Sequence, residues 1–267
     1  MADTPLEAFE NPARHAAVSA LIRSRSTNLT DVRDAVLHGL DLSGARAVLD
    51  LGCGFGFMTE VVARRVAPDA EIVGVDACEA NEKPYLDRVH ATGRRARFVC
   101  RKIERRLDWP DGAFDLVVAS YSLYFFPGVI PEIARVLRPN GLFLAVTHTE
   151  NSCRDLLHAA GLREPGAHGL GVIGGFSADN AGTLVDPWFS EVKRVDYQNS
   201  LVFDAAQYDD FLKYLWFKLP FLSYAAEPGG EPAEPLADAI RASLSRQSRV
   251  VFEKSDAAFC CRGPRCG

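Results

Sequence analysis

The chain has 267 residues, of which 48% are hydrophobic and 24% are charged, enough for one full core with a small cap or other elaborations. The formal net charge is −5 and acids and bases are mixed along the chain, so a nucleic-acid partner is not favoured. Residues 1–15 lack the apolar core of a signal peptide, and no run of about 18 apolar residues follows, so we expect a cytoplasmic protein with no membrane span.

The cysteines predict reduced thiols, several of them small core residues, because no export signal is seen. None of them forms a C-x-x-C pair. Adjacent Cys260 and Cys261, together with Cys266, are suited to a soft metal ion, but no second cluster completes a tetrahedral set. The sequence therefore predicts no metal site and indicates an incidental tail.

Residues 1–44 show a patchy helical pattern. Asn11-Pro12 can open one helix, and Thr30-Asp31 can cap a second that ends near residue 40. Five apolar runs then alternate with helical patterns, and runs that are apolar on both faces belong to a parallel sheet covered by helices. The pattern predicts a doubly wound α/β sheet with its ligand crevice at the carboxyl ends of the strands. The expected strands are 45–51, 71–75, 97–100, 115–119 and 142–147, with helices at 59–66, 84–93 and 129–137.

The last third of the chain is less regular. We expect a helix at 152–160, a glycine-rich loop at 166–175 and an aromatic-rich helix at 208–219. Residues 192–197 and 200–203 are strand-like, and 227–235 form a linker rich in proline, glycine and glutamate. After an amphipathic stretch at 236–248, residues 249–252 and 257–261 are expected to form a closing pair of strands.

Three glycines, Gly52, Gly54 and Gly56, follow the first apolar run. They remove Cβ atoms where the backbone bends sharply and a ligand comes close. A nicotinamide dinucleotide fingerprint needs a third glycine where Phe57 stands. Asp50, at the strand end, would repel a pyrophosphate and attract a cation. The loop therefore favours a cationic cofactor over a nicotinamide dinucleotide.

Four motifs in chain order resemble those of the class I S-adenosylmethionine-dependent methyltransferases of the small-molecule type. They are VLDLGCGFG, VGVDACE, FDLVVASYSLYFF and RVLRPNGLFLAV, and the resemblance covers about residues 45–148. It continues more weakly through FSEVKRVDYQNSLVF and VVFEKSDAAFCC, which are similar to the last two strands of the family. The resemblance implies a Rossmann-like, mostly parallel seven-stranded sheet. An N-terminal helical cap at 1–44 would precede a methyltransferase domain at 45–267, with a helical insert at about 161–248 before the last strand.

The resemblance also implies a set of cofactor contacts for S-adenosyl-L-methionine and its product S-adenosyl-L-homocysteine. The Asp50 carboxylate would lie near the ammonium of the methionine part, Asp76 would hold the ribose hydroxyls, and Ala77 would flank the adenine. The implied cofactor-binding residues are Asp50, Gly52, Cys53, Gly54, Gly56, Asp76, Ala77, Lys102, Ile103 and Ser120.

One position departs from the family. Where relatives often carry an aspartate that meets the adenine amino group, this chain has Lys102, which cannot accept a hydrogen bond. Adenine recognition would then rest on the backbone N–H of Ile103 and on stacking, or Glu104 would take over after a one-residue shift.

Methyl transfer from a sulfonium needs alignment of donor and acceptor, and it needs a base only if the acceptor must lose a proton early. Tyr121 and Tyr124 follow the fourth strand and are the candidate substrate contacts, with a core role as the alternative. His148, after the fifth strand, is the candidate catalytic base. Arg23 and Arg25 of the N-terminal segment are available to a carboxylate.

The resulting prediction is a methyltransferase that acts on a small organic molecule. Two alternatives remain open: a protein of this fold that binds the cofactor without turnover, and a metalloid methyltransferase that uses Cys153, Cys260 or Cys261 as arsenite ligands. The sequence predicts neither the acceptor atom nor the oligomeric state.

Overall fold

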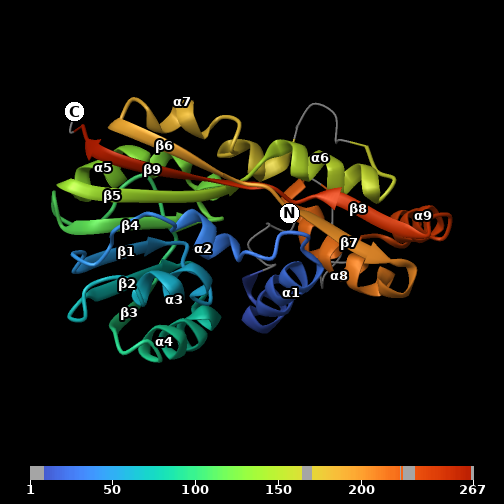
Figure 1. Cartoon of the computed structure of the whole chain (residues 1–267), viewed down its shortest axis with the longest axis horizontal. Helices are drawn as coiled ribbons and strands as arrows, with labels where there is room; N and C mark the ends of the chain where they lie inside the picture. The colour runs from blue at the N-terminus through green and yellow to red at the C-terminus, as the bar shows by residue number, and fades with distance from the viewer. Residues whose placement is uncertain (1–8, 164–169, 223, 225–231, 266–267) are drawn as a thin grey trace.

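The computed structural model describes residues 9–163, 170–222, 224 and 232–265, which fold around a seven-stranded sheet (Figure 1). Strands β1 to β5 run parallel, whereas β9 is antiparallel to both β5 and β6. The predicted doubly wound, mostly parallel sheet is therefore confirmed. In sheet order the strands are β3 (Arg95–Cys100), β2 (Glu71–Asp76), β1 (Ala47–Leu51), β4 (Phe114–Ser120), β5 (Leu137–His148), β9 (Asp256–Pro264) and β6 (Phe189–Tyr197).

Both faces of this sheet are buried, because successive side chains of a strand point to opposite faces and most are apolar. Val48 and Leu116 pack with residues of α3 and α4, while Leu49 and Val117 pack with residues of α5 and α7. The helices of the sheet region are α2 (Val32–Val36), α3 (Phe57–Ala63), α4 (Glu82–His90), α5 (Ile130–Val136) and α7 (Ala181–Val185).

A second, smaller sheet pairs β7 (Ser200–Asp204) with β8 (Arg249–Glu253) at the other end of the molecule (Figure 1). Four helices gather around it: α1 (Pro12–Arg25), α6 (Glu150–Ala159), α8 (Tyr208–Lys218) and α9 (Glu234–Leu244). The expected closing pair of 249–252 with 257–261 is wrong, because β8 pairs with β7 and β9 inserts between β5 and β6.

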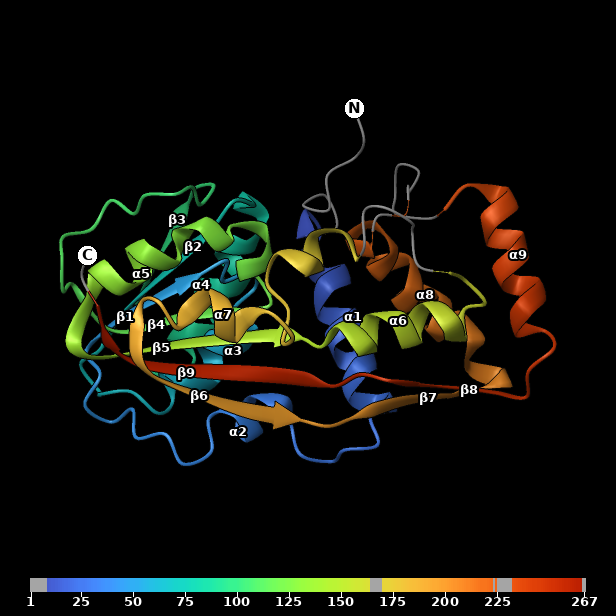
Figure 2. The ribbon, with the colours of Figure 1, turned by 90° about the horizontal axis from the view of Figure 1, so that it is seen from above.

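Two nearly continuous chain segments join the sheets. Only Gln198 and Asn199 separate β6 from β7, and only Lys254 and Ser255 separate β8 from β9. Figure 2 shows both segments running the length of the molecule. A segment that stays extended passes from one sheet to the other where the sequence suggested a hairpin.

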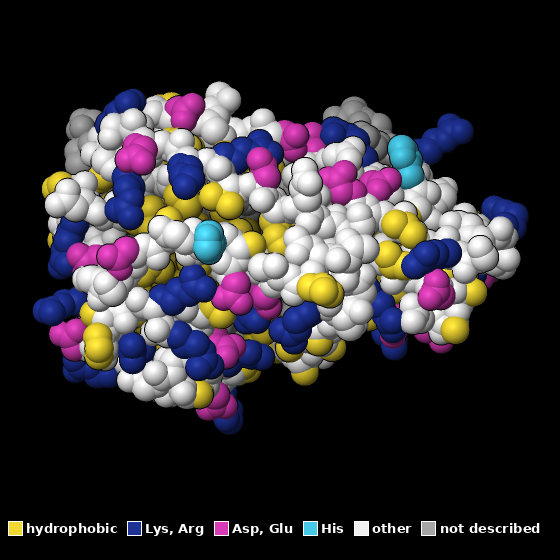
Figure 3. Space-filling view, viewed as in Figure 1, with side chains coloured by type: hydrophobic (Ala, Val, Ile, Leu, Met, Phe, Trp, Pro, Cys, Tyr) yellow, Lys and Arg dark blue, Asp and Glu magenta, His cyan; other side chains and the backbone are white. Residues whose placement is uncertain are grey.

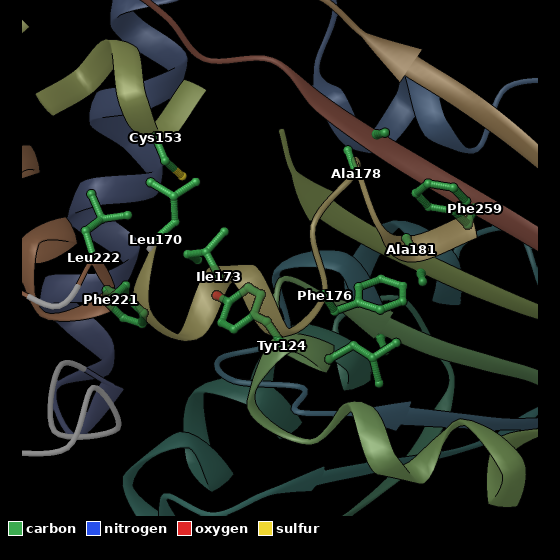
Figure 4. Packing of buried hydrophobic residues seen from close by; sticks show 14 of the residues in the cluster. Tyr124, Cys153, Leu170, Ile173, Phe176, Ala178, Ala181, Phe221, Leu222 and Phe259 are labelled. Atoms are coloured by element: carbon green, nitrogen blue, oxygen red, sulfur yellow. The ribbon is translucent and has the colours of Figure 1, made fainter. Parts of the chain in front are cut away.

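The remaining core lies where the two ends of the molecule meet. Tyr124, from the turn Leu123–Phe125, packs near Ile173 of the turn Gly171–Gly175 and near Phe221 of the turn Leu219–Leu222 (Figure 4). The predicted loop 166–175 and linker 227–235 lie partly outside the described residues. The division into a cap at 1–44 and an insert at 161–248 stays a prediction, and β6 of the main sheet lies within that insert range.

The outer surface carries mixed charges. Basic and acidic side chains alternate over the face shown in Figure 3. None of the helices in the described parts of the chain is long and apolar enough to cross a membrane.

Candidate functional site

A cavity of about 910 Å³ opens at the carboxyl ends of the parallel strands, near the upper end of the size range of small-molecule sites. Asp50, one residue before the end of β1, lines it, as do Asp76, Ser120 and His148, the last residues of β2, β4 and β5. Residues of α1 and the end of α8 line the opposite wall. The cavity therefore sits in the crevice that a doubly wound sheet predicts, with helices from the other end of the molecule across it.

The glycine turn after β1 brings the backbone close to this cavity. Gly52 has φ +72°, and a Cβ there would lie 2.4 Å from the Cβ of Ser122, whose hydroxyl donates to the carbonyl of Leu51. Only glycine fits this contact and this conformation. Gly52, Cys53 and Gly54 line the cavity, whereas Gly56 lies outside the lining, where it precedes α3 and packs by Tyr85.

Asp50 presents a buried carboxylate that is only half satisfied. It is 2% exposed, and its Oδ2 accepts a 2.5 Å hydrogen bond from Thr59, while Oδ1 is buried without a partner. Burial raises the pKa of Asp50 to about 7. The negative charge of Asp76 also raises it, whereas the hydrogen bond from Thr59 lowers it. A cation bound beside Oδ1 would relieve this arrangement.

Asp76 is held rigidly at the end of β2. Its Oδ2 accepts from the backbone N–H of Gly54 at 2.8 Å, and its Oδ1 accepts from that of Cys78 at 2.9 Å. Ala77 follows it in the cavity wall, with exposed Lys102 and half-buried Ile103 from the neighbouring strand end. Glu104, the alternative to Lys102, is not among the residues that line the cavity.

The end of β4 supplies a strained residue and an unpaired hydroxyl. Tyr121 adopts φ 55°, which is uncommon for an aromatic residue. Its ring stacks on His148 with centroids 4.7 Å apart. The Oγ of Ser120, which also lines the cavity, is buried without a partner. Strain and unpaired polar atoms concentrated in one cavity are typical of a ligand site.

His148 belongs to a buried chain of polar groups at the far end of the cavity. Its Nδ1 donates to Asp256 at 2.7 Å, and its Nε2 accepts from the Lys218 ammonium at 2.9 Å. Lys254 donates to both oxygens of Asp256 at 2.7 and 2.6 Å. The antiparallel register explains part of this contact, because His148 of β5 lies opposite Asp256 of β9.

These contacts fix the charges of the cluster. Burial lowers the pKa of His148 to about 3, and the positive charges of Lys218 and Lys254 act in the same direction, so the imidazole is neutral. Burial alone would raise the pKa of Asp256, but Lys254 and the bond from His148 hold it well below its ordinary value. Burial and the charge of Lys254 lower the pKa of Lys218 to about 8.

Aromatic rings form the wall between the glycine turn and this cluster. The ring of Phe9 makes edge contacts with His15, Phe125, Phe217 and Phe221 at centroid distances of 4.9 to 6.0 Å. His15 stacks on Phe217 and its Nδ1 is buried without a partner.

The cavity brings together all the cofactor, substrate and base candidates named from the sequence except Gly56 and Glu104. Arg25 and the candidate arsenite ligands Cys153, Cys260 and Cys261 are not among its lining residues either. Arg23 lines the cavity, but Arg25 is paired with Asp210 at 2.9 Å. Cys260 and Cys261 face opposite sides of β9 in separate core clusters, and Cys266 lies outside the described residues. Two cysteines on opposite faces of a sheet do not share one ion.

The charged partners of His148 were missed from the sequence: Lys218, Lys254 and Asp256. The available signals were a lysine within the apolar run LWFKLPFL and the charged pair of EKSDAA before an apolar strand. Neither signal gives the pairing with His148, which joins residues 70 and 108 positions apart.

Comparisons with known proteins agree with the resemblance. Residues 48–141 match a methyltransferase domain family. The chain is 32% identical over 111 residues to a ubiquinone biosynthesis O-methyltransferase of Idiomarina loihiensis, covering 40% of this chain and 44% of that protein. It is 32% identical over 176 residues to a trans-aconitate 2-methyltransferase of Variovorax paradoxus, covering 63% of this chain and 62% of that protein.

The curated relatives are matched only in part, because the aligned segments span between 38% and 62% of their length. Among solved structures, the [4+2]-cyclase SpnF has a TM-score of 0.54 at 18% identity, over 94% of each chain. This likeness shows a shared fold and nothing about the reaction.

Proposed function

Because the chain carries a domain of the class I S-adenosylmethionine-dependent methyltransferase family, we propose that it transfers a methyl group from S-adenosyl-L-methionine to a small organic acceptor. The residues of the cavity fit this cofactor. Asp50 offers an unpaired buried carboxylate oxygen to an ammonium, and Gly52 leaves room for close approach of a ligand. The unpaired hydroxyl of Ser120 offers a further polar contact.

The other cofactor contacts follow from position in the wall. Asp76 would accept hydrogen bonds from the ribose hydroxyls chiefly at Oδ2, because Oδ1 already accepts from Cys78 and from the side chain of Asn81. Ala77 and Ile103 would flank the adenine, and Lys102 would lie at its exposed edge. The proposed cofactor-binding residues remain Asp50, Gly52, Cys53, Gly54, Gly56, Asp76, Ala77, Lys102, Ile103 and Ser120, with Gly56 acting through the shape of the turn.

When bound, S-adenosyl-L-methionine supplies an already activated methyl group. The protein then has to align the acceptor and exclude water, which the helices across the cavity favour. Tyr121 and Tyr124 line the cavity between the glycine turn and His148 and are proposed to contact the acceptor. His148 is neutral, but its Nε2 already accepts from the Lys218 ammonium. To act as the base, His148 would take a proton from Lys218 while Lys218 takes the proton of the acceptor.

The observation that carries the proposal is the buried, half-satisfied carboxylate of Asp50 beside a glycine turn in this cavity. This carboxylate favours binding of a cation and disfavours binding of a pyrophosphate, which is negatively charged.

The first test removes the proposed ribose contact. Asp76→Ala should raise the dissociation constant of S-adenosyl-L-homocysteine about tenfold or more, because a hydrogen bond to a charged group contributes about 1.5–3 kcal/mol. Calorimetry on the wild type and the variant measures this directly. Asp87→Ala, an exposed change on α4, is the control. No heat with the wild type at millimolar ligand would sink the proposed function, and an unchanged affinity in Asp76→Ala would remove Asp76 from the ribose.

A second candidate is a protein that binds the cofactor without methyl turnover. One observation favours keeping it: Lys102 stands where the family commonly carries an acid. A radiolabelled methyl group followed through a broad acceptor screen separates the two. Tight binding of S-adenosyl-L-homocysteine, with no radiolabelled methyl group transferred to any acceptor, would favour this second candidate.

A further inference from the structure

Charged side chains of both signs line the cavity. Asp50 and Asp76 lie by the glycine turn, whereas Lys218, Lys254 and Asp256 gather around His148. Relatives act in ubiquinone biosynthesis and on trans-aconitate, so their names do not fix the acceptor of this chain. The class of acceptor is therefore inferred from the residues at the His148 end of the cavity.

The groups at the far end of the cavity, around His148, carry one more positive charge than negative charge. Lys254 and Asp256 form a buried ion pair, with side chains 6% and 3% exposed, and His148 is neutral. Two ammonium groups and one carboxylate leave a net charge of +1. Among the described residues, Lys218 has no carboxylate within ion-pair distance, and its ammonium donates to the Nε2 of His148. A cation without a counter-ion at the edge of an apolar site is costly unless a ligand supplies the anion.

The surroundings of Lys218 define the rest of the ligand. The ammonium lies 5.6 Å from the centre of the Phe221 ring, and Phe217 and Phe125 line the same wall. These rings suit a flat or apolar body, and they offer few polar partners apart from the unpaired Nδ1 of His15.

We propose that the methyl acceptor is an apolar organic acid whose carboxylate binds the Lys218 ammonium while its body packs against the aromatic wall. This inference rests on the proposed function. His148 is then a positioning residue: its Nδ1 is anchored to Asp256, and its Nε2 holds one proton of the ammonium, which aims the remaining two into the cavity. Asp256 and Lys254 are positioning residues too, because they hold the His148 ring that orients the Lys218 ammonium.

The test compares acids with neutral molecules of the same shape. Benzoate, cinnamate and decanoate, each paired with its primary amide, are titrated calorimetrically into protein saturated with S-adenosyl-L-homocysteine. The wild type should bind at least one acid about tenfold or more tighter than its amide, the discrimination expected of a charge-assisted hydrogen bond. Lys218→Met should bring that ratio close to one, and Lys218→Arg should restore part of it because the charge is kept.

A matched control lies on the same helix. Lys213→Met removes an exposed lysine, 70% accessible, and should leave the acid preference unchanged. Thermal denaturation of each variant checks that it is folded.

Three outcomes overturn the inference. The first is a wild type that binds S-adenosyl-L-homocysteine but prefers no acid of the panel over its amide. A wild type that binds none of the probes counts as the same outcome. The second is an acid preference that survives in folded Lys218→Met. The third is a loss of S-adenosyl-L-homocysteine affinity in Lys218→Met, which would assign Lys218 to the carboxylate of the cofactor. In each case the proposed function stands, whereas failure of the wild type to bind S-adenosyl-L-homocysteine would remove both.

Discussion

At the scale of single residues, burial moves one acid and one base toward neutrality at opposite ends of one cavity. The pKa of Asp50 rises to about 7 and that of Lys218 falls to about 8. Each is the side chain that a ligand of opposite charge would restore to its charged form. The role of Asp50 could be expected from its place before the glycines, whereas that of Lys218 depends on a contact between α8 and β5 that no local pattern encodes.

The pH dependence of cofactor binding should follow Asp50. Below pH 7 the free carboxyl is mostly protonated, and only its ionised form attracts an ammonium, so S-adenosyl-L-homocysteine affinity should rise from about pH 6 to pH 8. Binding at pH 7 should release a proton, seen as a binding heat that depends on the ionisation enthalpy of the buffer. His15 and His148, with pKa values lowered to about 3, stay neutral throughout this range.

Asp50→Asn provides the comparison. The variant should bind more weakly and lose the rise between pH 6 and pH 8. The same rise in the variant would show that another group titrates and would contradict the assignment.

At the scale of elements, the turn between β1 and α3 depends on glycine at Gly52. Gly52→Ala places a methyl group 2.4 Å from the Cβ of Ser122 and forces φ +72° on alanine. We expect a loss of about 1–3 kcal/mol in the free energy of unfolding, measured by urea denaturation, and weaker binding of S-adenosyl-L-homocysteine. Gly182→Ala in α7, where a Cβ meets nothing within 4 Å, should leave both nearly unchanged. Equal effects of the two changes would contradict this account.

The strands show where local pattern is enough and where it is not. Apolar runs bury both faces of a parallel strand, so the five parallel strands were found close to their observed bounds, although β5 begins at Leu137 rather than near residue 142. The prediction that 249–252 pairs with 257–261 was wrong, because two apolar runs with Lys254 and Ser255 between them resemble a hairpin. Which strand each run pairs with is decided by the packing of distant parts of the chain, and that information is not local.

At the scale of the whole molecule, the ion pair of Lys254 and Asp256 lies at the passage from the small sheet to the large one. Lys254→Met leaves the Asp256 carboxylate buried with His148 as its remaining side-chain partner and should cost about 3–5 kcal/mol of unfolding free energy. The double variant Lys254→Met with Asp256→Asn should regain much of this loss, as denaturant titrations can show. A double variant less stable than the single one would contradict the pairing.

The fold class could be predicted, and so could the residues that line the cavity at the ends of β1 and β2, because these residues follow strands in a regular order. The charged partners of His148 could not be predicted, because α8 and the segment from β8 to β9 bring them from two distant stretches of the chain.

The stretch that matches the methyltransferase domain family ends at residue 141, before His148, Lys218, Lys254 and Asp256. The charged part of the proposed acceptor site therefore lies after the matched stretch, whereas the proposed acceptor contacts Tyr121 and Tyr124 lie within it. Changes in the later part of the chain are expected to alter the charged end of the cavity while the proposed cofactor contacts stay in place. Chimaeras joined after β5 would be a practical way to move acceptor preference between such proteins.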